Sequence, residues 1–516
     1  MDTPLNSVLP LVCAVAPIVW LYVSLCVLRL PSYIAFPIGL ATVAVLALLV
    51  WDRSIVEISS AALEGVLFAL WPILLIVFAA MLLFRYSEES GGMDTIKALF
   101  VGASSDRRVL ALILAWGFCG FLESISGFGA PVLIPAAIMV TLGFSPMTAV
   151  VCCLIGNTTP TPFAQVGIPV LTLSSVTGLD AVPLGAHIAV QTLLPSLLLP
   201  FLIVIVAGGS VCAVRGVFLV TLASALSFAL PVFALAYFAG PELPTLIGSI
   251  CAITGTMVAN RWLYSATEEN ARYQLDQAKS TPESKVPQRM STASACLPFI
   301  LVIAIVLVTC LVSPVRDALA PFATKATIYT GEGARPLTFA WIATPGILIL
   351  VATIVACLVQ GRSLAMLARS AGTIVRSSGR MATAVISVVA MAKVMSYGGM
   401  TDEIAVWLVA VFGSYYPLIA PVIGTLGTFI TGSDTSCAVL FGSLQAKAAA
   451  AVGADPSWVA ASNLSGAALG KMISPQSVAI GLGVGGLDGQ EGIILKRTMK
   501  YSIVFVLLIC LITFLG

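Results

Sequence analysis

The sequence contains few charged residues. Lys, Arg, Asp and Glu together make up 9% of its 516 residues, whereas a typical soluble domain contains about 25%. Hydrophobic residues make up 59% of the chain, and the mean hydropathy is +1.07. This composition excludes an ordinary soluble protein and indicates a membrane protein.

Histidine is almost absent, since His187 is the only one in the chain. A histidine-rich metal site is therefore excluded, and so is a zinc protease motif. The 12 cysteines form no Cys-x-x-Cys pair and mostly lie in apolar runs, so we interpret them as packing residues. We expect no metal and no cofactor. The net charge of +2 does not indicate nucleic-acid binding, because Lys and Arg are concentrated between the apolar runs.

Long apolar runs dominate the rest of the chain. Each is long enough to cross a bilayer as a helix, which needs about 20 residues. The clearest runs are Val8–Leu28, Ile34–Trp51, Val66–Phe84, Ala186–Ala207, Val217–Ala239, Leu297–Val312 and Trp341–Val359. They predict an all-α polytopic membrane protein with about 12–14 transmembrane helices, some of them broken or re-entrant. Asp2 replaces the basic start of a signal peptide, so the first run is interpreted as a transmembrane helix.

The distribution of basic residues predicts the topology. The polar linker 260–295 and the stretch Arg362–Arg380 are rich in Lys and Arg, so both should face the cytoplasm. The segment Ser313–Phe339 between the two intervening spans should then face outside. We divide the chain into N-terminal helices (1–51), a first transport repeat with peripheral helices (52–259), the linker (260–295), connecting helices (296–360) and a second transport repeat (361–516).

Two polar stretches of the same kind interrupt the apolar sequence. The first comprises Gly120–Ala130 and Gly156–Pro169, and the second comprises Gly427–Cys437 and Ser462–Pro475. Several short matches occur in order at nearly one separation. One set shares its internal spacing across the two stretches: Asn157, Gln165 and Pro169 in the first, and Asn463, Lys471 and Pro475 in the second. Polar residues are costly inside a bilayer, so a duplicated set indicates a functional site within an internal repeat.

Loop charge predicts that the repeat is inverted. The segment Arg85–Arg108 is basic and should be cytoplasmic, whereas the equivalent segment Ser396–Glu403 has no Lys or Arg and should lie outside. Equivalent loops on opposite sides are typical of the inverted repeats of secondary transporters.

Glycine and proline predict where the helices break. Gly127, Gly129, Pro131 and Pro135 cannot share one continuous helix, so a span should end near Glu123 and a half-helix should begin near Pro131. We expect similar breaks at Asn157–Pro169, Thr431–Thr435 and Ile473–Pro475. Broken backbone at membrane depth is tolerated where it is buried in protein or lines a wet cavity.

The polar stretches contain two carboxylates and one cation. Glu123 and Asp434 lie at the predicted breaks and are the candidate proton-coupling residues. A carboxylate partly removed from water binds a proton more readily than one in water. Lys471 is the candidate for binding an anionic substrate, and Asp434 is its expected partner when no substrate is bound. Capping of helices and pairing with buried cations are the structural alternatives for the two acids.

Hydrogen-bonding groups surround these three charges in the sequence. The further substrate-binding candidates are Asn157, Asn463, Ser124, Ser126, Gly127, Thr158, Gln165, Thr431, Ser433, Thr435, Ser436, Ser465 and Gln476. Amides, hydroxyls and half-helix N-termini can bind a carboxylate, or they can simply satisfy freed backbone groups. Two other charges, Glu64 and Lys393, are interpreted as lying at the membrane boundary.

Two enzyme-like patterns lack their context. Gly481–Gly486 resembles a dinucleotide fingerprint but follows no strand. Gly466–Met472 resembles a phosphate loop but is one residue short and has no Ser or Thr after its Lys. The sequence therefore does not favour an enzyme.

At the same polar stretches the sequence resembles the lactate permease family. The matching segments are Glu123–Pro131, Leu142–Pro146, Asn157–Pro160, Thr431–Ser436, Leu440–Gln445 and Gly470–Ser477. The resemblance implies a plasma-membrane symporter that carries L-lactate, D-lactate and glycolate with protons. Three positions depart from the family pattern beside the proposed site: Ser124 replaces an expected Gly, Gly156 an expected Ala, and Gln165 lies in a Gly-rich stretch.

Two alternatives to proton symport remain open. Broken helices with hydroxyls and amides also form sodium sites, so a sodium-coupled carrier of small organic anions is possible. An anion channel would conduct without gradient-coupled accumulation. The sequence does not determine stoichiometry or oligomeric state.

Overall fold

The chain is almost entirely helical in the computed structural model, which describes residues 8–28, 30–101, 103–125, 129–264, 268–275, 290–334, 336–482, 484, 487 and 490–516. Eight helical stretches among these residues are long and apolar enough to cross a membrane, and further apolar helices are shorter. The prediction of an all-α polytopic membrane protein with broken helices is confirmed. Part of the predicted linker, 265–267 and 276–289, lies outside the described residues.

The N-terminal fifth of the chain forms long helices. They are α1 (Val8–Tyr22), η2 (Val23–Val27), α2 (Ser32–Val50), α3 (Ile55–Phe68), η3 (Ala69–Leu74), α4 (Leu75–Glu89) and α5 (Gly92–Val101). The apolar run Val66–Phe84 is not one straight helix, because Trp71 leaves helical geometry at φ −133° and ψ 111°. Pro72 explains the break, since proline disfavours the helical conformation in the residue before it.

The first polar stretch lies in a series of short helical pieces. They are α6 (Arg107–Ala111), η4 (Leu112–Phe118), α7 (Cys119–Ile125), α8 (Ala130–Thr141), α9 (Pro146–Gly156), η5 (Thr161–Phe163) and α10 (Ala164–Thr177). Longer helices follow: α11 (Ala181–Gly208), η6 (Val211–Val214), α12 (Phe218–Phe238), α13 (Pro244–Leu263) and α14 (Glu268–Ala271).

The second half begins with α15 (Thr292–Leu311), α16 (Ser313–Leu319), α17 (Pro345–Val359) and α18 (Leu364–Ser377). The remaining helices are α19 (Gly379–Gly398), α20 (Met400–Phe412), η8 (Gly413–Tyr415), α21 (Tyr416–Thr431), α22 (Asp434–Ala451), α23 (Pro456–Lys471), α24 (Pro475–Leu482) and α25 (Glu491–Leu515), and the second polar stretch lies in α21 to α24. Between α16 and α17, the strands β1 (Ala323–Ala326) and β2 (Leu337–Ala340) pair antiparallel, which the sequence did not predict.

The helix breaks occur at the positions that were predicted from glycine and proline. α7 ends at Ile125 and α8 begins after Gly129, whose φ of +91° suits glycine. In the second stretch, α21 ends at Thr431 and α22 begins at Asp434. In both polar stretches, therefore, a helix ends, the backbone is interrupted, and a second helix begins. The inverted sense of the repeat stays a prediction.

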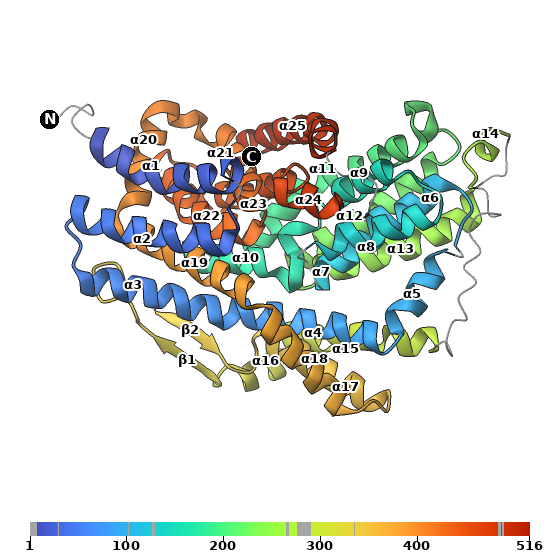
Figure 1. The fold of residues 1–516 in the computed structure, drawn as a ribbon, viewed down its shortest axis with the longest axis horizontal. Helices are drawn as coiled ribbons and strands as arrows, with labels where there is room; N and C mark the ends of the chain where they lie inside the picture. Colours follow the sequence, from blue (N-terminus) through green and yellow to red (C-terminus); the bar gives the residue numbers. More distant parts are fainter. Residues whose placement is uncertain are drawn as a thin grey trace.

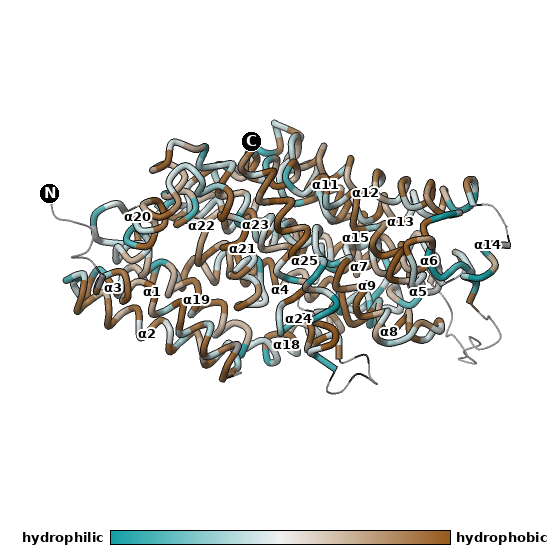
Figure 2. The backbone as a smooth tube through the Cα atoms, turned by 90° about the horizontal axis from the view of Figure 1, so that it is seen from above, coloured by the Kyte–Doolittle hydropathy of each residue, from teal (hydrophilic) through white to brown (hydrophobic). Residues whose placement is uncertain are grey.

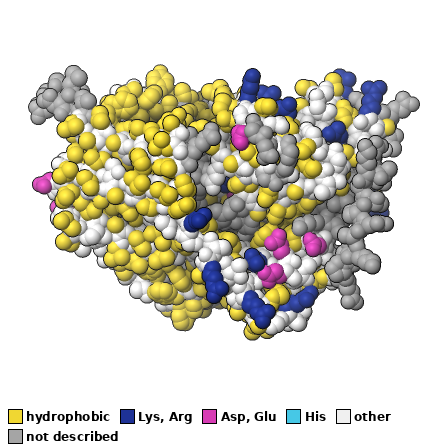
Figure 3. Space-filling model, in the orientation of Figure 1, with side chains coloured by type: hydrophobic (Ala, Val, Ile, Leu, Met, Phe, Trp, Pro, Cys, Tyr) yellow, Lys and Arg dark blue, Asp and Glu magenta, His cyan; other side chains and the backbone are white. Residues whose placement is uncertain are grey.

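The broken helices lie between the two ends of the molecule. In Figure 1, α1, α2, α3, α19 and α20 lie toward one end, while α6, α8, α9, α12 and α13 lie toward the other. Helices α7, α10, α22 and α23 lie between them. Figure 2 shows hydrophobic helices throughout, with hydrophilic segments around α6 and α14 and beside α20. In Figure 3 a broad hydrophobic surface covers one half of the face, and basic side chains gather along the lower edge near α17 and α18.

A buried ion pair joins α3 to α19. Lys393 Nζ donates to Glu64 Oε1 at 2.8 Å, and the Tyr397 hydroxyl donates to the same oxygen at 3.0 Å. The two charged side chains are 12% and 2% exposed respectively. Their place at the membrane boundary stays a prediction. The structure shows that the two charges pair across the helices, because a lone buried charge would be costly.

A second buried ion pair connects separate segments at the end that carries α6. Arg108 is fully buried, and its guanidinium binds both oxygens of Asp106 at 3.0 and 2.6 Å. The remaining donors reach three acceptors in other segments, the carbonyl oxygens of Ala213 and Arg215 and Oδ1 of Asn270. Because each bond satisfies a buried group, this arginine ties α6, η6 and α14 together.

The Tyr264 hydroxyl completes the same cluster by donating to Asp106 Oδ2 at 2.9 Å. Partial burial and the neighbouring Asp106 carboxylate raise the pKa of Tyr264 to about 12. The hydroxyl therefore stays protonated and remains a donor across the physiological pH range.

We expect Arg108→Lys to destabilise the protein by about 1–3 kcal/mol, because lysine retains the charge but leaves several buried acceptors unpaired. Thermal unfolding of the purified protein in detergent measures the change. Arg316→Lys is the matched control, since Arg316 is 64% exposed and lies 3.8 Å from Asp317. A melting temperature for Arg108→Lys equal to that of the control would contradict the role assigned to Arg108.

Candidate functional site

A cavity of about 90 Å³ lies where the broken helices meet, and we call it the central cavity. This volume can hold several water molecules. Its polar wall contains Glu123, Asn157, Thr161, Gln165, Ser433, Asp434, Thr435, Ser436, Lys471, Gln476 and Ser477. Its apolar wall contains Ile73, Val77, Val132, Ile168, Val385, Val388, Val389, Val439 and Ile480. The lining thus offers polar groups for a charged ligand and apolar side chains for a small hydrocarbon group.

An ion pair between the two polar stretches crosses the central cavity. Lys471 Nζ donates to Glu123 Oε1 at 3.3 Å, and the two side chains are 17% and 2% exposed. Lys471 is the last residue of α23, where the negative end of the helix dipole favours a cation. Glu123 Oε2 is buried and has no hydrogen-bond partner among the described residues.

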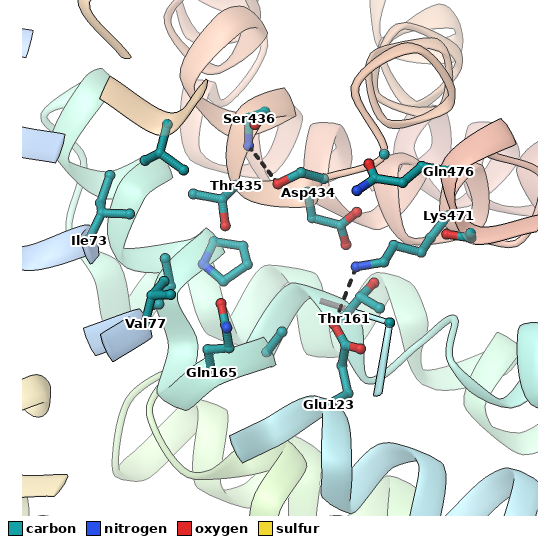
Figure 4. A pocket seen from close by; sticks show the side chains of 18 of the residues that line it. Ile73, Val77, Glu123, Thr161, Gln165, Asp434, Thr435, Ser436, Lys471 and Gln476 are labelled. Atoms are coloured by element: carbon teal, nitrogen blue, oxygen red, sulfur yellow. Dashed lines mark hydrogen bonds and ion pairs between the residues drawn. The ribbon is translucent and has the colours of Figure 1, made fainter. Parts of the chain in front are cut away.

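Asp434 approaches the same ammonium group from the other side. Figure 4 shows Lys471 extending between the carboxylates of Asp434 and Glu123. Lys471 nevertheless bonds Glu123 and not Asp434, its predicted partner. Asp434 Oδ1 accepts a hydrogen bond from Thr428 at 3.2 Å, whereas the buried Oδ2 accepts none from the described residues. Asp434 is the first residue of α22, where the helix dipole favours a carboxylate.

Three consecutive residues at the start of α10 adopt left-handed backbone conformations. Gln165 has φ 46° and ψ 55°, Val166 has φ 57° and ψ 44°, and Gly167 has φ 80°. Left-handed geometry costs a non-glycine residue of order 1–3 kcal/mol, and it is especially unfavourable for a β-branched residue such as Val166. Strain of this kind persists where the surroundings impose it, and here it places Gln165 in the wall of the central cavity.

The structure gathers about half of the predicted site residues around the central cavity. Those in its wall are Glu123, Asn157, Gln165, Ser433, Asp434, Thr435, Ser436, Lys471 and Gln476. They lie in or directly beside the two polar stretches, at or near the ends of α7, α9, α10, α22, α23 and α24. Figure 4 shows Gln165 and Thr435 on the side of the cavity away from Lys471.

The other predicted residues that the structure describes do not line the central cavity. Ser124, Thr158 and Thr431 donate their hydroxyls to backbone carbonyls of their own helices, at 2.7–2.8 Å. Ser465 donates to Gln191 Oε1 at 2.7 Å, and Asn463 accepts from Gln445 Nε2 at 3.3 Å. Ser126 and Gly127 lie outside the described residues.

Sequence reasoning missed part of the cavity wall. Thr161 lies between the predicted residues Asn157 and Gln165, and its hydroxyl side faces Asp434 (Figure 4). Its position inside the polar stretch could have identified it. The apolar wall residues of η3, α4 and α19 have no such signal, because a valine that lines a cavity has the same sequence pattern as one that faces lipid.

Gly156 allows two helices of the site to approach closely. It ends α9, and a Cβ at this position would lie 1.7 Å from the Ala115 carbonyl oxygen of η4. The departure from the expected alanine therefore matches the packing, because only glycine fits there. The contact also fixes the end of α9 from which Asn157 reaches the central cavity.

Comparisons with known proteins point to one family. The model of the family described as L-lactate permease matches residues 10–516. An L-lactate permease of Streptococcus iniae is 42% identical over 449 residues, covering 87% of this chain and 92% of that protein. The glycolate permease GlcA of Escherichia coli is 30% identical and covers 97% of this chain and 94% of its own length.

A solved structure resembles the chain more distantly. The YdaH transporter of Alcanivorax borkumensis aligns with 85% of this chain and 84% of its own, at 14% sequence identity and a TM-score of 0.46.

We expect Gly156→Ala to destabilise the protein by about 1–3 kcal/mol, because η4 and α9 must separate to admit the methyl group. The matched control is Gly372→Ala in α18, where a Cβ meets no atom within 4 Å. Replacing a helical glycine there should be neutral or stabilising by about 0.5–1 kcal/mol. Thermal unfolding in detergent distinguishes the two, and equal melting temperatures would refute the close packing at Gly156.

Proposed function

This chain belongs to the L-lactate permease family, and we propose that it carries L-lactate, D-lactate and glycolate across the cell membrane together with protons. The family and its named relatives establish a membrane transporter of small monocarboxylates, not an enzyme. The proton, the choice among these acids and the cell membrane as location are the parts that we propose.

The observation that carries the proposal is the group Glu123–Lys471–Asp434 in the central cavity. Two carboxylates and one ammonium carry one net negative charge when all three are ionised. A monocarboxylate that entered this group alone would double that charge in surroundings where charge is poorly solvated. A proton that enters with it keeps the net charge unchanged.

This balance of charge couples the movement of the substrate carboxylate to the movement of the proton. The empty site and the site that holds both proton and carboxylate have the same net charge, so both can reorient past apolar residues at similar electrostatic cost. A site that holds the carboxylate alone is more negative, and its reorientation is correspondingly less favourable. Uncoupled leakage of the anion is thereby suppressed.

Lys471 is the residue that we propose to bind the substrate carboxylate. Its ammonium is more exposed to the cavity than the carboxylate of Glu123, so an entering anion can compete for it. Ser433, Thr435 and Ser436 also line the cavity, as does Gln476, and their hydroxyl and amide groups can donate further hydrogen bonds. The apolar residues of the lining suit the methyl group of lactate.

Asp434 is the carboxylate that we propose to take up the proton. Glu123 bonds directly to the ammonium, whereas the recorded bond to Asp434 comes from a neutral hydroxyl. Asp434 Oδ2 is buried and has no hydrogen-bond partner among the described residues, so a proton can be added there without breaking a bond to any of them. Once protonated, Asp434 becomes a hydrogen-bond donor to the substrate.

Proteoliposome uptake of labelled L-lactate tests this assignment under an imposed pH gradient at fixed sodium concentration. We expect Asp434→Asn to reduce gradient-driven accumulation at least tenfold while retaining lactate–lactate exchange, which needs no net proton movement. Lys471→Gln should lose both activities because it lacks the substrate-binding cation. Asp317→Asn, at an exposed carboxylate, is the control and should retain both.

Three outcomes would contradict the proposal. Full gradient-driven accumulation in both Asp434→Asn and Glu123→Gln would exclude them as the proton site. Accumulation that follows a sodium gradient at constant pH would indicate a sodium-coupled carrier. Net current without accumulation would indicate an anion channel.

A further inference from the structure

A second, larger cavity of about 630 Å³ lies beside the central cavity, and we call it the vestibule. Val439 of α22 lines both spaces. The charged and hydroxyl-bearing residues of the vestibule wall include Arg53, Glu64, Lys393, Ser396, Ser443 and Lys447. Its wall also contains the acids Glu332 and Asp402, so it has charges of both signs, and it shares the apolar residue Val439 with the central cavity.

The same helices form the walls of both spaces. α19 contributes Val385, Val388 and Val389 to the central cavity, and one to two turns later it contributes Lys393 and Ser396 to the vestibule. α10 and α22 also line both spaces along their lengths. A solute that moves along these helices thus passes from the vestibule to the central cavity.

A third cavity adjoins the central one at the other end of α19. It contains Arg380 and shares Val385, Ser436 and Gln476 with the central cavity. The central cavity therefore lies between two other spaces, which alternating access requires. By the positive-inside rule, the end with Arg380 faces the cytoplasm and the vestibule faces outside.

The ion pair between Glu64 and Lys393 lies in the wall of the vestibule. Glu64 Oε1 accepts from both Lys393 and Tyr397, whereas the buried Oε2 has no hydrogen-bond partner among the described residues. Gly65 permits this pairing, since a Cβ there would lie 2.5 Å from Ala390 Cα and would push α3 away from α19.

This pair repeats the arrangement at the centre of the molecule. In both pairs a nearly fully buried glutamate uses one oxygen to bind a lysine, and its other oxygen has no hydrogen-bond partner within the described part of the chain. In both, the lysine is the more exposed partner and borders a cavity. Lys471 is the cation that binds substrate in the proposed function, so Lys393 has the same chemical capability earlier on the path.

We propose that Lys393 forms an outer binding subsite for the substrate carboxylate in the vestibule, with Glu64 as its counter-ion when the subsite is empty. The proposal rests on the proposed function of the central cavity. The substrate displaces Glu64 from Lys393, is held there beside the hydroxyls of Ser396 and Ser443, and then passes Val439 to reach Lys471. No covalent step is involved.

Two variants with opposite expected effects test the subsite. Uptake of L-lactate is measured in right-side-out membrane vesicles over a range of concentrations. Glu64→Gln removes the competing counter-ion, so KM should fall about threefold or more. The double variant Glu64→Gln with Lys393→Gln replaces the pair without leaving a lone buried charge, and KM should rise about tenfold with the maximal rate retained.

Lys447→Gln is the matched control. Lys447 is a cation in the same vestibule, but it is 39% exposed and already paired with Asp402 at 2.5 Å. Its replacement should change KM less than about twofold, because exposed ion pairs contribute little. A purely structural role for Glu64 and Lys393 predicts that Glu64→Gln impairs uptake, and that result would overturn the subsite.

Equilibrium binding of labelled L-lactate separates failure of the subsite from failure of the proposed function. Lys471→Met should still bind lactate weakly, and the added replacements Glu64→Gln and Lys393→Gln should abolish that binding. If Lys471→Met abolishes all binding, only the subsite is overturned. If the wild-type protein binds no L-lactate, D-lactate or glycolate, the proposed function fails and the subsite fails with it.

Discussion

The need to keep charge paired inside the membrane governs this structure. Glu123, Lys471 and Asp434 meet in the central cavity although they come from helices far apart in the chain. Removing one partner of a buried ion pair typically costs about 3–5 kcal/mol, so the Glu123–Lys471 pair also connects the two polar stretches. The pairing is incomplete, because one buried oxygen of each carboxylate has no hydrogen-bond partner among the described residues. The proposed proton and substrate sites rest on this incompleteness.

The helix breaks allow Glu123, Asp434 and Lys471 to lie together in the central cavity. An unbroken helix would carry Asp434 and Lys471 past the centre of the protein with their backbone groups already bonded. The break before Asp434 and the end of α23 at Lys471 instead place each charge at the helix end whose dipole stabilises it. The left-handed residues Gln165 and Val166 show that the first stretch accepts backbone strain for the same purpose.

The two polar stretches contribute unequally to the site. Asn157 lines the central cavity, whereas its counterpart Asn463 is bonded within a buried network that includes Gln445. Gln165 and Lys471 also occupy corresponding positions, and only one of them is charged. The resulting site has a cation on one side and hydroxyls and amides around it, which suits a ligand with one charged end. The second ion pair, at Glu64 and Lys393, extends this chemistry toward the vestibule.

Composition and local sequence pattern determined that the chain is a helical membrane protein and where its helices break. They also identified the charged residues that are candidates for the functional site. These properties depend on hydropathy and on backbone preferences of glycine and proline, which act over a few residues. Tertiary structure alone decided that Lys471 bonds Glu123 and not Asp434, that Glu64 and Lys393 are partners, and which hydroxyls face the cavity. Those outcomes depend on how distant helices pack, because a buried charge is stabilised by whichever partner the fold brings within a few ångströms of it, and no local pattern encodes that partner.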